Sequence, residues 1–206
     1  MKRKITILTI AFLSSMLMYA SAFAAATGRC GDSITWTLDD SGNLTLSGSG
    51  EMWNNGYDDS PFKDYEIRKA TVKYGITSIG ESAFLGCRGM TELTLPNSVT
   101  SIGYYAFYGC SGLTELTLPD SVASIGDGAF ICCSDLSKIT SLAEIPPMCG
   151  SGVFDRVNKT NCELIVPIVS VTAYKQAEVW NEFSNIRGFS GVEVTVADKT
   201  RKIVVE

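Results

Sequence analysis

The chain has 206 residues, 45% of them apolar, and carries 17 Lys and Arg against 22 Asp and Glu, a net charge of -5. This apolar content excludes a disordered chain, and the length allows one domain or two small ones. An acidic surface repels phosphate backbones, so nucleic acid is not expected as a partner.

The first residues have the layout of a secretory signal peptide. Lys2, Arg3 and Lys4 precede an apolar stretch from Ile5 to about Tyr19, and small residues follow. We therefore expect residues 1–24 to be removed on export. Serines interrupt the stretch, whereas a spanning helix needs about 20 apolar residues, so no membrane span is expected in the mature chain. Removal leaves 14 basic against 22 acidic residues, a net charge of -8.

Residues 25–66 predict an N-terminal cap. Alternate residues of 34–38 are apolar, and the alternation returns in 44–46 after a turn rich in Asp, Gly and Asn. Two alternating runs about such a turn predict a β-hairpin. We expect this hairpin, with Met52 and Trp53, to seal the first of the repeats that follow.

Residues 67–166 contain a repeat with a period of 23 residues. Three full windows, 78–100, 101–123 and 124–146, share one register, which extends backwards to residue 67. Such a period indicates one small unit stacked on its neighbours, because each unit alone cannot bury its apolar face. Leu113, Leu116 and Leu118 form the L-x-x-L-x-L signature of a leucine-rich repeat, in which a short strand points alternate side chains inward. The pattern predicts a solenoid of about five coils.

Each coil is expected to contain one strand and one tight connection. The register places parallel strands near 69–73, 92–95, 115–118 and 138–141, with a fifth at 163–166. The stretch around Ala106 and Phe107 is too short for an independent helix. It predicts a single helical turn or a loop that carries a Phe into the core.

Residues 167–188 predict a C-terminal cap of strand and helix. Pro167 stops the fifth strand, and Ser170 is expected to cap a helix that runs through Tyr174 and Trp180 to about Phe183. Residues 189–206 contain two further β-rich runs. They predict either a closing hairpin or the start of an incomplete module.

The seven cysteines predict buried thiols more than disulfides. Cys87, Cys110 and Cys133 occupy one repeat position, where parallel Cβ vectors give poor disulfide geometry and free thiols pack as small hydrophobes. Cys149 and Cys162 flank a short connection and are the pair for which a disulfide is most expected. The odd count leaves at least one thiol unpaired.

The residue types argue against catalysis and metal binding. The chain has no histidine, so Ser-His-Asp and Cys-His pairs and His-ligated metal sites are absent. No C-x-x-C spacing occurs, and the acids of residues 40–51 lack the ligand positions of a calcium loop. Glu92 and Glu115 lie on an open face, without the burial that would raise the pKa of a catalytic acid. We expect no cofactor, no metal and no enzymatic activity.

The outward positions of the predicted strands form two columns. The first is Lys69, Glu92, Glu115 and Lys138, and the second is Thr71, Thr94, Thr117 and Thr140. In the first column the two outer pairs attract and the central Glu pair repels. These columns form either a solvated face that uses the β preference of threonine or a flat surface that meets a ligand.

A second candidate surface lies on the opposite side of the coil. Tyr104, Tyr105 and Tyr108 crowd one repeat, where the neighbouring repeats have small or acidic residues. Clustered exposed tyrosines suit protein or sugar contacts. The alternative is ordinary packing of Tyr108 beside Leu85 and Ile131.

The repeat core, G-C-x-x-L-T-x-L-T-L-P-x-S-V-x-x-I-G, resembles the BspA-like leucine-rich repeats of exported proteins from host-associated bacteria. The entry segment at 30–38 and the closing segment at 164–175 are similar as well, and the degenerate turn at 143–147 departs from the pattern. The resemblance implies a leucine-rich repeat solenoid of short parallel strands, with a hairpin cap and a strand-helix cap. It also implies a surface or secreted protein that engages other proteins, usually in adhesion, and it carries over no catalytic residue.

Together these observations predict a secreted or cell-surface, non-enzymatic module. Its expected partner is an extracellular protein, such as a host matrix or cell-surface protein. One alternative is a carbohydrate-binding accessory module with a glycan ligand. The other is a docking or inhibitory partner of a secreted enzyme.

Overall fold

The computed structural model describes residues 26–57, 59–190, 192–196 and 199–203. The signal peptide expected at 1–24 lies outside the described residues. Within these residues, no helix has both the length and the apolar character needed to cross a membrane.

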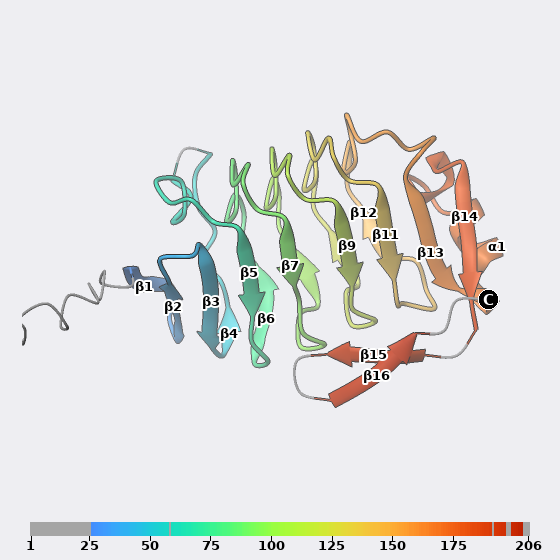
Figure 1. The fold of residues 1–206 in the computed structure, drawn as a ribbon. Coiled ribbons are helices and arrows are strands. Elements are labelled where there is room, and N and C mark those ends of the chain that lie inside the picture. Colours follow the sequence, from blue (N-terminus) through green and yellow to red (C-terminus); the bar gives the residue numbers. More distant parts are fainter. Residues whose placement is uncertain (1–25, 58, 191, 197–198, 204–206) are drawn as a thin grey trace, which may run out of the picture.

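The chain winds into a solenoid with two rows of short strands (Figure 1). The first strand row contains β3 (Asn43–Gly48), β5 (Lys69–Val72), β7 (Glu92–Thr94), β9 (Glu115–Leu118), β11 (Lys138–Ser141), β13 (Glu163–Pro167) and β14 (Asn185–Phe189). The second strand row contains β4 (Gly50–Glu51), β6 (Ile76–Ile79), β8 (Ser101–Ile102), β10 (Ser124–Ile125) and β12 (Met148–Cys149).

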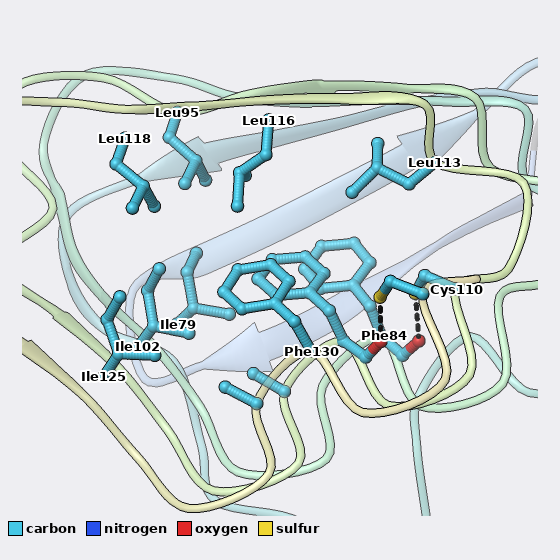
Figure 2. Close-up of a cluster of buried hydrophobic side chains, with 14 of the residues drawn as sticks. Ile79, Phe84, Leu95, Ile102, Cys110, Leu113, Leu116, Leu118, Ile125 and Phe130 are labelled. Carbon is cyan, nitrogen blue, oxygen red and sulfur yellow. Dashed lines mark hydrogen bonds between the residues drawn. The ribbon is translucent and has the colours of Figure 1, made fainter. Parts of the chain in front are cut away.

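Paired strands within each row are parallel, which confirms the predicted leucine-rich repeat solenoid. The sequence prediction found the first row up to β13 but not the second, because four of the five strands in the second row have only two residues, too few to show an alternation. Side chains alternate as expected in the first row: Leu116 and Leu118 are buried, whereas Glu115 and Thr117 are exposed. Isoleucines at 79, 102 and 125 stack beneath them from the second row (Figure 2).

The connections from the second row to the first are runs of tight turns without a regular helix. The N–H groups of Ala83 and Leu85 donate within their own coil, to the carbonyls of Gly80 and Ser82 at 3.3 and 3.2 Å, with the i to i+3 spacing of a 3-10 turn. The backbone N–H groups of Ser82 and Phe84 donate to the carbonyls of Tyr104 and Ala106 in the next coil, at 2.9 and 2.7 Å. The loops therefore add a third line of hydrogen bonds along the solenoid.

A row of aromatic rings runs through the core from one cap to the other. The buried phenylalanines at 62, 84, 107, 130 and 154 stack with successive centroid distances of 5.0, 5.0, 5.1 and 5.5 Å. Figure 2 shows the central rings of this stack. Trp36 lies 5.6 Å from the first phenylalanine and Trp180 lies 5.4 Å from the last. We call this set of rings the aromatic spine.

All seven cysteines are free thiols. Cys110 and Cys133 donate through Sγ to the carbonyls of Phe84 and Phe107, at 3.2 and 3.3 Å. The disulfide most expected from the sequence, Cys149 with Cys162, is not formed. The two thiols lie in different parts of the coil, since Cys149 belongs to β12 of the second row and Cys162 directly precedes β13 of the first.

The N-terminal cap is a hairpin with one additional strand. β2 (Ile34–Leu38) pairs antiparallel with β3 as predicted, and β1 (Ala26–Gly31) pairs with β2 on its other side. Met52 is buried, but the prediction that Trp53 also seals the coil is wrong. Trp53 is 44% exposed, and its indole N–H donates to Asp32 at 2.9 Å.

The C-terminal cap has a shorter helix than predicted. α1 (Val171–Gln176) lies between two 3-10 turns, η1 (Ile168–Ser170) and η2 (Trp180–Glu182). Ser170 holds the N-cap position, but its hydroxyl makes no capping bond. The helix ends early because Ala177 is extended, with a φ of -77° and a ψ of 136°, and Val179 then takes a φ of 69°.

The sequence prediction also missed β14, which pairs parallel with β13 and extends the first row. Beyond it, β15 (Val192–Val196) and β16 (Lys199–Ile203) pair antiparallel as a two-stranded hairpin.

Candidate binding surface

The first candidate, the outer face of the first strand row, contains two ion pairs. Lys69 Nζ lies 2.8 Å from Glu92, and Lys138 Nζ lies 3.5 Å from Glu115. All four side chains are substantially exposed. Pairs of this kind contribute about 0 to 1 kcal/mol to stability, so they explain the local choice of residues without a ligand.

This face is not one continuous array. Among the described strands, no ladder joins β7 to β9, so the column is interrupted between Glu92 and Glu115, where like charges meet. The threonine column is not uniformly accessible either: Thr117 is exposed, Thr71 and Thr94 are half-buried, and Thr140 is only 7% exposed. The expected flat surface is therefore shorter than the sequence suggested.

The second candidate is a cluster of four tyrosines at the edge where the chain passes from the second row to the first. The Tyr104 and Tyr105 ring centroids lie 3.8 Å apart, and those of Tyr105 and Tyr108 lie 5.3 Å apart. Tyr57 meets the same group, 5.9 Å from Tyr105 and 6.0 Å from Tyr108. We call Tyr57, Tyr104, Tyr105 and Tyr108 the tyrosine cluster.

Tyr57 reaches the cluster from the loop that leads into the first repeat. The loop is held to the neighbouring coil at Glu81, whose N–H donates to Asn54 Oδ1 at 3.0 Å and whose carbonyl accepts from the Asn55 N–H at 3.1 Å. The sequence prediction missed Tyr57. The run Asn54-Asn55-Gly56 indicates a loop, but nothing in it indicates where the loop lies.

Tyr105 holds its place through an unusual backbone conformation. Its φ is 53°, in the left-handed region that costs a non-glycine residue about 1 to 2 kcal/mol. Ser82 and Gly128 have the same conformation at the equivalent position, with φ values of 52° and 61°. The Tyr105 ring covers Gly128, where an added Cβ would lie 2.2 Å from Tyr105 Cε1. A glycine in the next coil is thus required for this ring position.

Two carboxylates flank the cluster. Glu81 and Asp127 occupy the position of Tyr104 in the preceding and following coils, and both are exposed. A side-chain hydrogen bond to Tyr105 raises the pKa of Tyr104 to about 12, and the negative charges of Asp127 and Glu81 act in the same direction. A hydrogen bond to Tyr57 raises the pKa of Tyr108. These two phenols are therefore neutral near pH 7.

Two hollows lie near these residues. One, of about 480 Å³, is lined by Tyr65, Arg68, Cys87 and Arg88 among others. The other, of about 240 Å³, is strongly polar and shares Glu81 with the border of the tyrosine cluster, together with Asn54, Ser78 and Ser101. Within the described part of the chain, no group of three or more His, Cys, Asp or Glu residues could hold a metal ion.

The fold defines a leucine-rich repeat protein. Residues 57–174 match the family described as the BspA type leucine rich repeat region, in six copies. The match covers more than half of the 206 residues, so the chain belongs to this family. Six copies are one more than the five coils expected from the sequence.

A solved structure with a TM-score above 0.5 supports the same fold. A leucine-rich repeat protein from Eubacterium ventriosum shares 25% identity, with a TM-score of 0.54, over 80% of this chain and 40% of that one. A leucine-rich repeat protein from Bacteroides ovatus shares 21% identity, with a TM-score of 0.49, over 72% of this chain and 42% of that one. This chain thus spans about two fifths of the Eubacterium ventriosum protein. No curated protein matches the chain significantly.

Family membership indicates a repeat module for protein interaction, of a fold that is typically a non-enzymatic scaffold. Proteins with these repeats are often found at bacterial surfaces. The tyrosine cluster is the candidate binding site that the geometry favours within this module.

Proposed function

We propose that this protein is an exported, non-enzymatic recognition module that binds an extracellular protein through the tyrosine cluster. A host matrix or cell-surface protein, bound in adhesion, is the partner we expect. The observation that carries the proposal is the contact of Tyr57 with Tyr105 and Tyr108, because it joins the exposed Tyr57 ring to two half-buried rings of a separate segment in one surface.

The exposure of the rings fits binding more than core packing. Tyr57 is 52% exposed and Tyr104 is 41% exposed, whereas the aromatic spine is buried. Tyrosine offers a large, rigid, amphipathic contact area with little loss of conformational entropy, which is why it is enriched at interfaces. The repeats supply the rigid support, and the contact residues come from one atypical coil and from the loop that carries Tyr57.

The interrupted strand face is the weaker candidate, since its charges are already paired with each other. A glycan ligand is the second candidate function. It is favoured by the polar hollow that shares Glu81 with the border of the tyrosine cluster, because carboxylate, amide and hydroxyl groups beside aromatic rings suit sugar hydroxyls.

The test is a comparison of variants in binding to extracellular proteins and to a glycan array. Tyr104→Ser with Tyr105→Ser should abolish capture of the partner, and melting temperature should not fall, since Ser82 shows that serine fits this backbone. Tyr74→Ser is the matched control, because Tyr74 is 67% exposed on a turn between β5 and β6.

Retained capture by the double tyrosine variant would contradict the proposal. If Glu92→Gln with Glu115→Gln abolishes capture and the double tyrosine variant does not, the binding site lies on the outer face of the first strand row. Binding to the glycan array alone would favour the second candidate function.

A further inference from the structure

We infer that the tyrosine cluster takes a cationic group, an arginine or lysine side chain presented by the partner. The inference rests on the proposed function and specifies the chemistry of the partner at the same site. Three observations carry it: the placement of two carboxylates, the absence of an ion pair to either of them among the described residues, and the exposed tyrosine rings beside them.

The two carboxylates lie on either side of Tyr104 along the solenoid axis. The N–H of Ser82 donates to the Tyr104 carbonyl at 2.9 Å, and the N–H of Tyr105 donates to the Asp127 carbonyl at 3.1 Å. These bonds place residues 81, 104 and 127 in successive coils, separated by roughly the 4.8 Å of neighbouring strands. A single side chain inserted at Tyr104 would therefore lie near both acids.

Within the described residues, neither acid forms an ion pair with a basic side chain. The ion pairs of Lys69, Lys138, Lys159 and Arg187 all go to acids other than Glu81 and Asp127. Asp127 Oδ1 accepts the Ser151 N–H at 2.9 Å. This bond fixes the position of the carboxylate and leaves its charge in place.

The rings pack directly against one another. The Tyr57 ring meets Tyr105 and Tyr108 edge to face, at 73° and 67°. The face of a tyrosine ring attracts a cation within about 6 Å of its centroid, so a cation would bind on the outer surface of the cluster, at the exposed rings of Tyr57 and Tyr104. A guanidinium stacks on the ring and also donates to a carboxylate, so Arg uses both features.

Other ligand classes use less of this surface. An anionic ligand would be repelled by Glu81 and Asp127, and a neutral sugar would stack on the rings without using either charge. A cationic side chain is attracted by rings and carboxylates together. The acidic character of the chain as a whole also favours a basic partner.

The experiment is an NMR titration of the full chain, with tyrosine rings labelled, against two matched probes. The first probe is N-acetyl-arginine methylamide. The second is N-acetyl-citrulline methylamide, in which a neutral urea replaces the guanidinium. We expect saturable shifts of the Tyr57 and Tyr104 ring signals with the arginine probe, and binding at least about threefold weaker with the citrulline probe.

Variants identify the charges responsible. Glu81→Gln with Asp127→Asn should weaken binding of the arginine probe by about threefold or more. The matched control is Asp120→Asn with Glu144→Gln, which removes two exposed acids from the connections at the opposite edge, where the chain passes from the first row to the second. This control should leave the affinity unchanged.

Each outcome decides the inference. Equal binding of the two probes, or no ring shifts with either, overturns the cationic inference. A third outcome separates the inference from the proposed function. If Tyr104→Ser with Tyr105→Ser abolishes capture of a protein partner, but Glu81→Gln with Asp127→Asn does not affect it, the proposed function holds and the cationic inference is rejected. Ring shifts with an N-acetylglucosamine oligomer, and none with arginine, would assign the cluster to glycans.

Discussion

The Phe107 and Phe130 rings stack 5.1 Å apart and within 8° of parallel, from equivalent positions of successive coils. Phe107 stacks on Phe84 on one side and on Phe130 on the other, so one phenylalanine contacts both neighbouring coils. Phe107→Ala should lower the free energy of unfolding by about 3 to 5 kcal/mol, through lost burial and the cavity that remains. Urea unfolding followed by circular dichroism measures this. A loss below about 1 kcal/mol would show that the spine does not hold the coils together.

The C-terminal end of the spine is fixed by a polar contact as well. Trp180 Nε1 donates to the Pro147 carbonyl at 2.9 Å from a fully buried position. Trp180→Phe retains an aromatic ring but leaves this carbonyl without its donor, and it should reduce stability by about 1 to 3 kcal/mol. Trp53→Phe is the control, since Trp53 is 44% exposed, and it should change stability little. Equal effects of the two substitutions would contradict the account of the cap.

The buried thiols predict lower stability in alkaline solution. Burial raises the pKa of Cys87 and of Cys133 from 9.0 to about 12. Between these values an unfolded thiol loses its proton while the folded one keeps it, so deprotonation favours unfolding as pH rises from about 9 towards 12. Each thiol should contribute up to about 1.4 kcal/mol per pH unit in this range.

The measurement is urea unfolding at pH 7.5 and pH 10. Cys87→Ala with Cys133→Ala should be less stable at pH 7.5 but should lose less stability between the two pH values than the unsubstituted chain. An unchanged pH dependence in this variant would show that these thiols do not ionise on unfolding.

Gly128 links backbone conformation to the tyrosine cluster. Its φ is 61°, and any Cβ would collide with the Tyr105 ring. Gly128→Ala should therefore destabilise the protein by about 1 to 2 kcal/mol and also displace Tyr105, which should weaken partner binding.

Gly150→Ala is a poor control for Gly128→Ala, because Asp127 crowds that position. Gly86→Ala is better, since Gly86 has a positive φ of 77° and open space around it. It should lower stability without affecting binding.

Export predicts a defined mature N-terminus. Cleavage after Ala24 would give a secreted chain that begins at Ala25, detectable by intact mass in the medium of an expressing bacterium. A retained Met1 on a chain recovered only from the cytoplasm would contradict export and, with it, the extracellular partner.

The repeat register predicted β5, β7, β9, β11 and β13 of the first strand row, because Leu116, Leu118 and most of their equivalents are apolar and each of these strands has at least three residues. The second row was missed because β8 and β10 are two residues each. The helix of the C-terminal cap was predicted too long, because the spacing of Tyr174 and Trp180 fits a helix, while the extended backbone of Ala177 has no signal in the sequence.

The candidate site was predicted in part for a similar reason. Tyr104, Tyr105 and Tyr108 stand out against Ser82 and Gly128 at matching positions, which a repeat alignment reveals. Tyr57 lies in an irregular loop, so its approach to the cluster depends on tertiary contacts at Glu81 that local sequence does not encode. The burial of Thr140, likewise, depends on neighbours distant in the chain.

The most direct test of the tyrosine cluster as the recognition surface is amide hydrogen exchange of the full chain, with and without its captured partner. We predict added protection in 53–57 and 103–109, the two segments that bring the tyrosines together, and no change in β5, β7, β9 and β11. Protection confined to those four strands would contradict the account, because it would place the partner on the outer face of the first strand row.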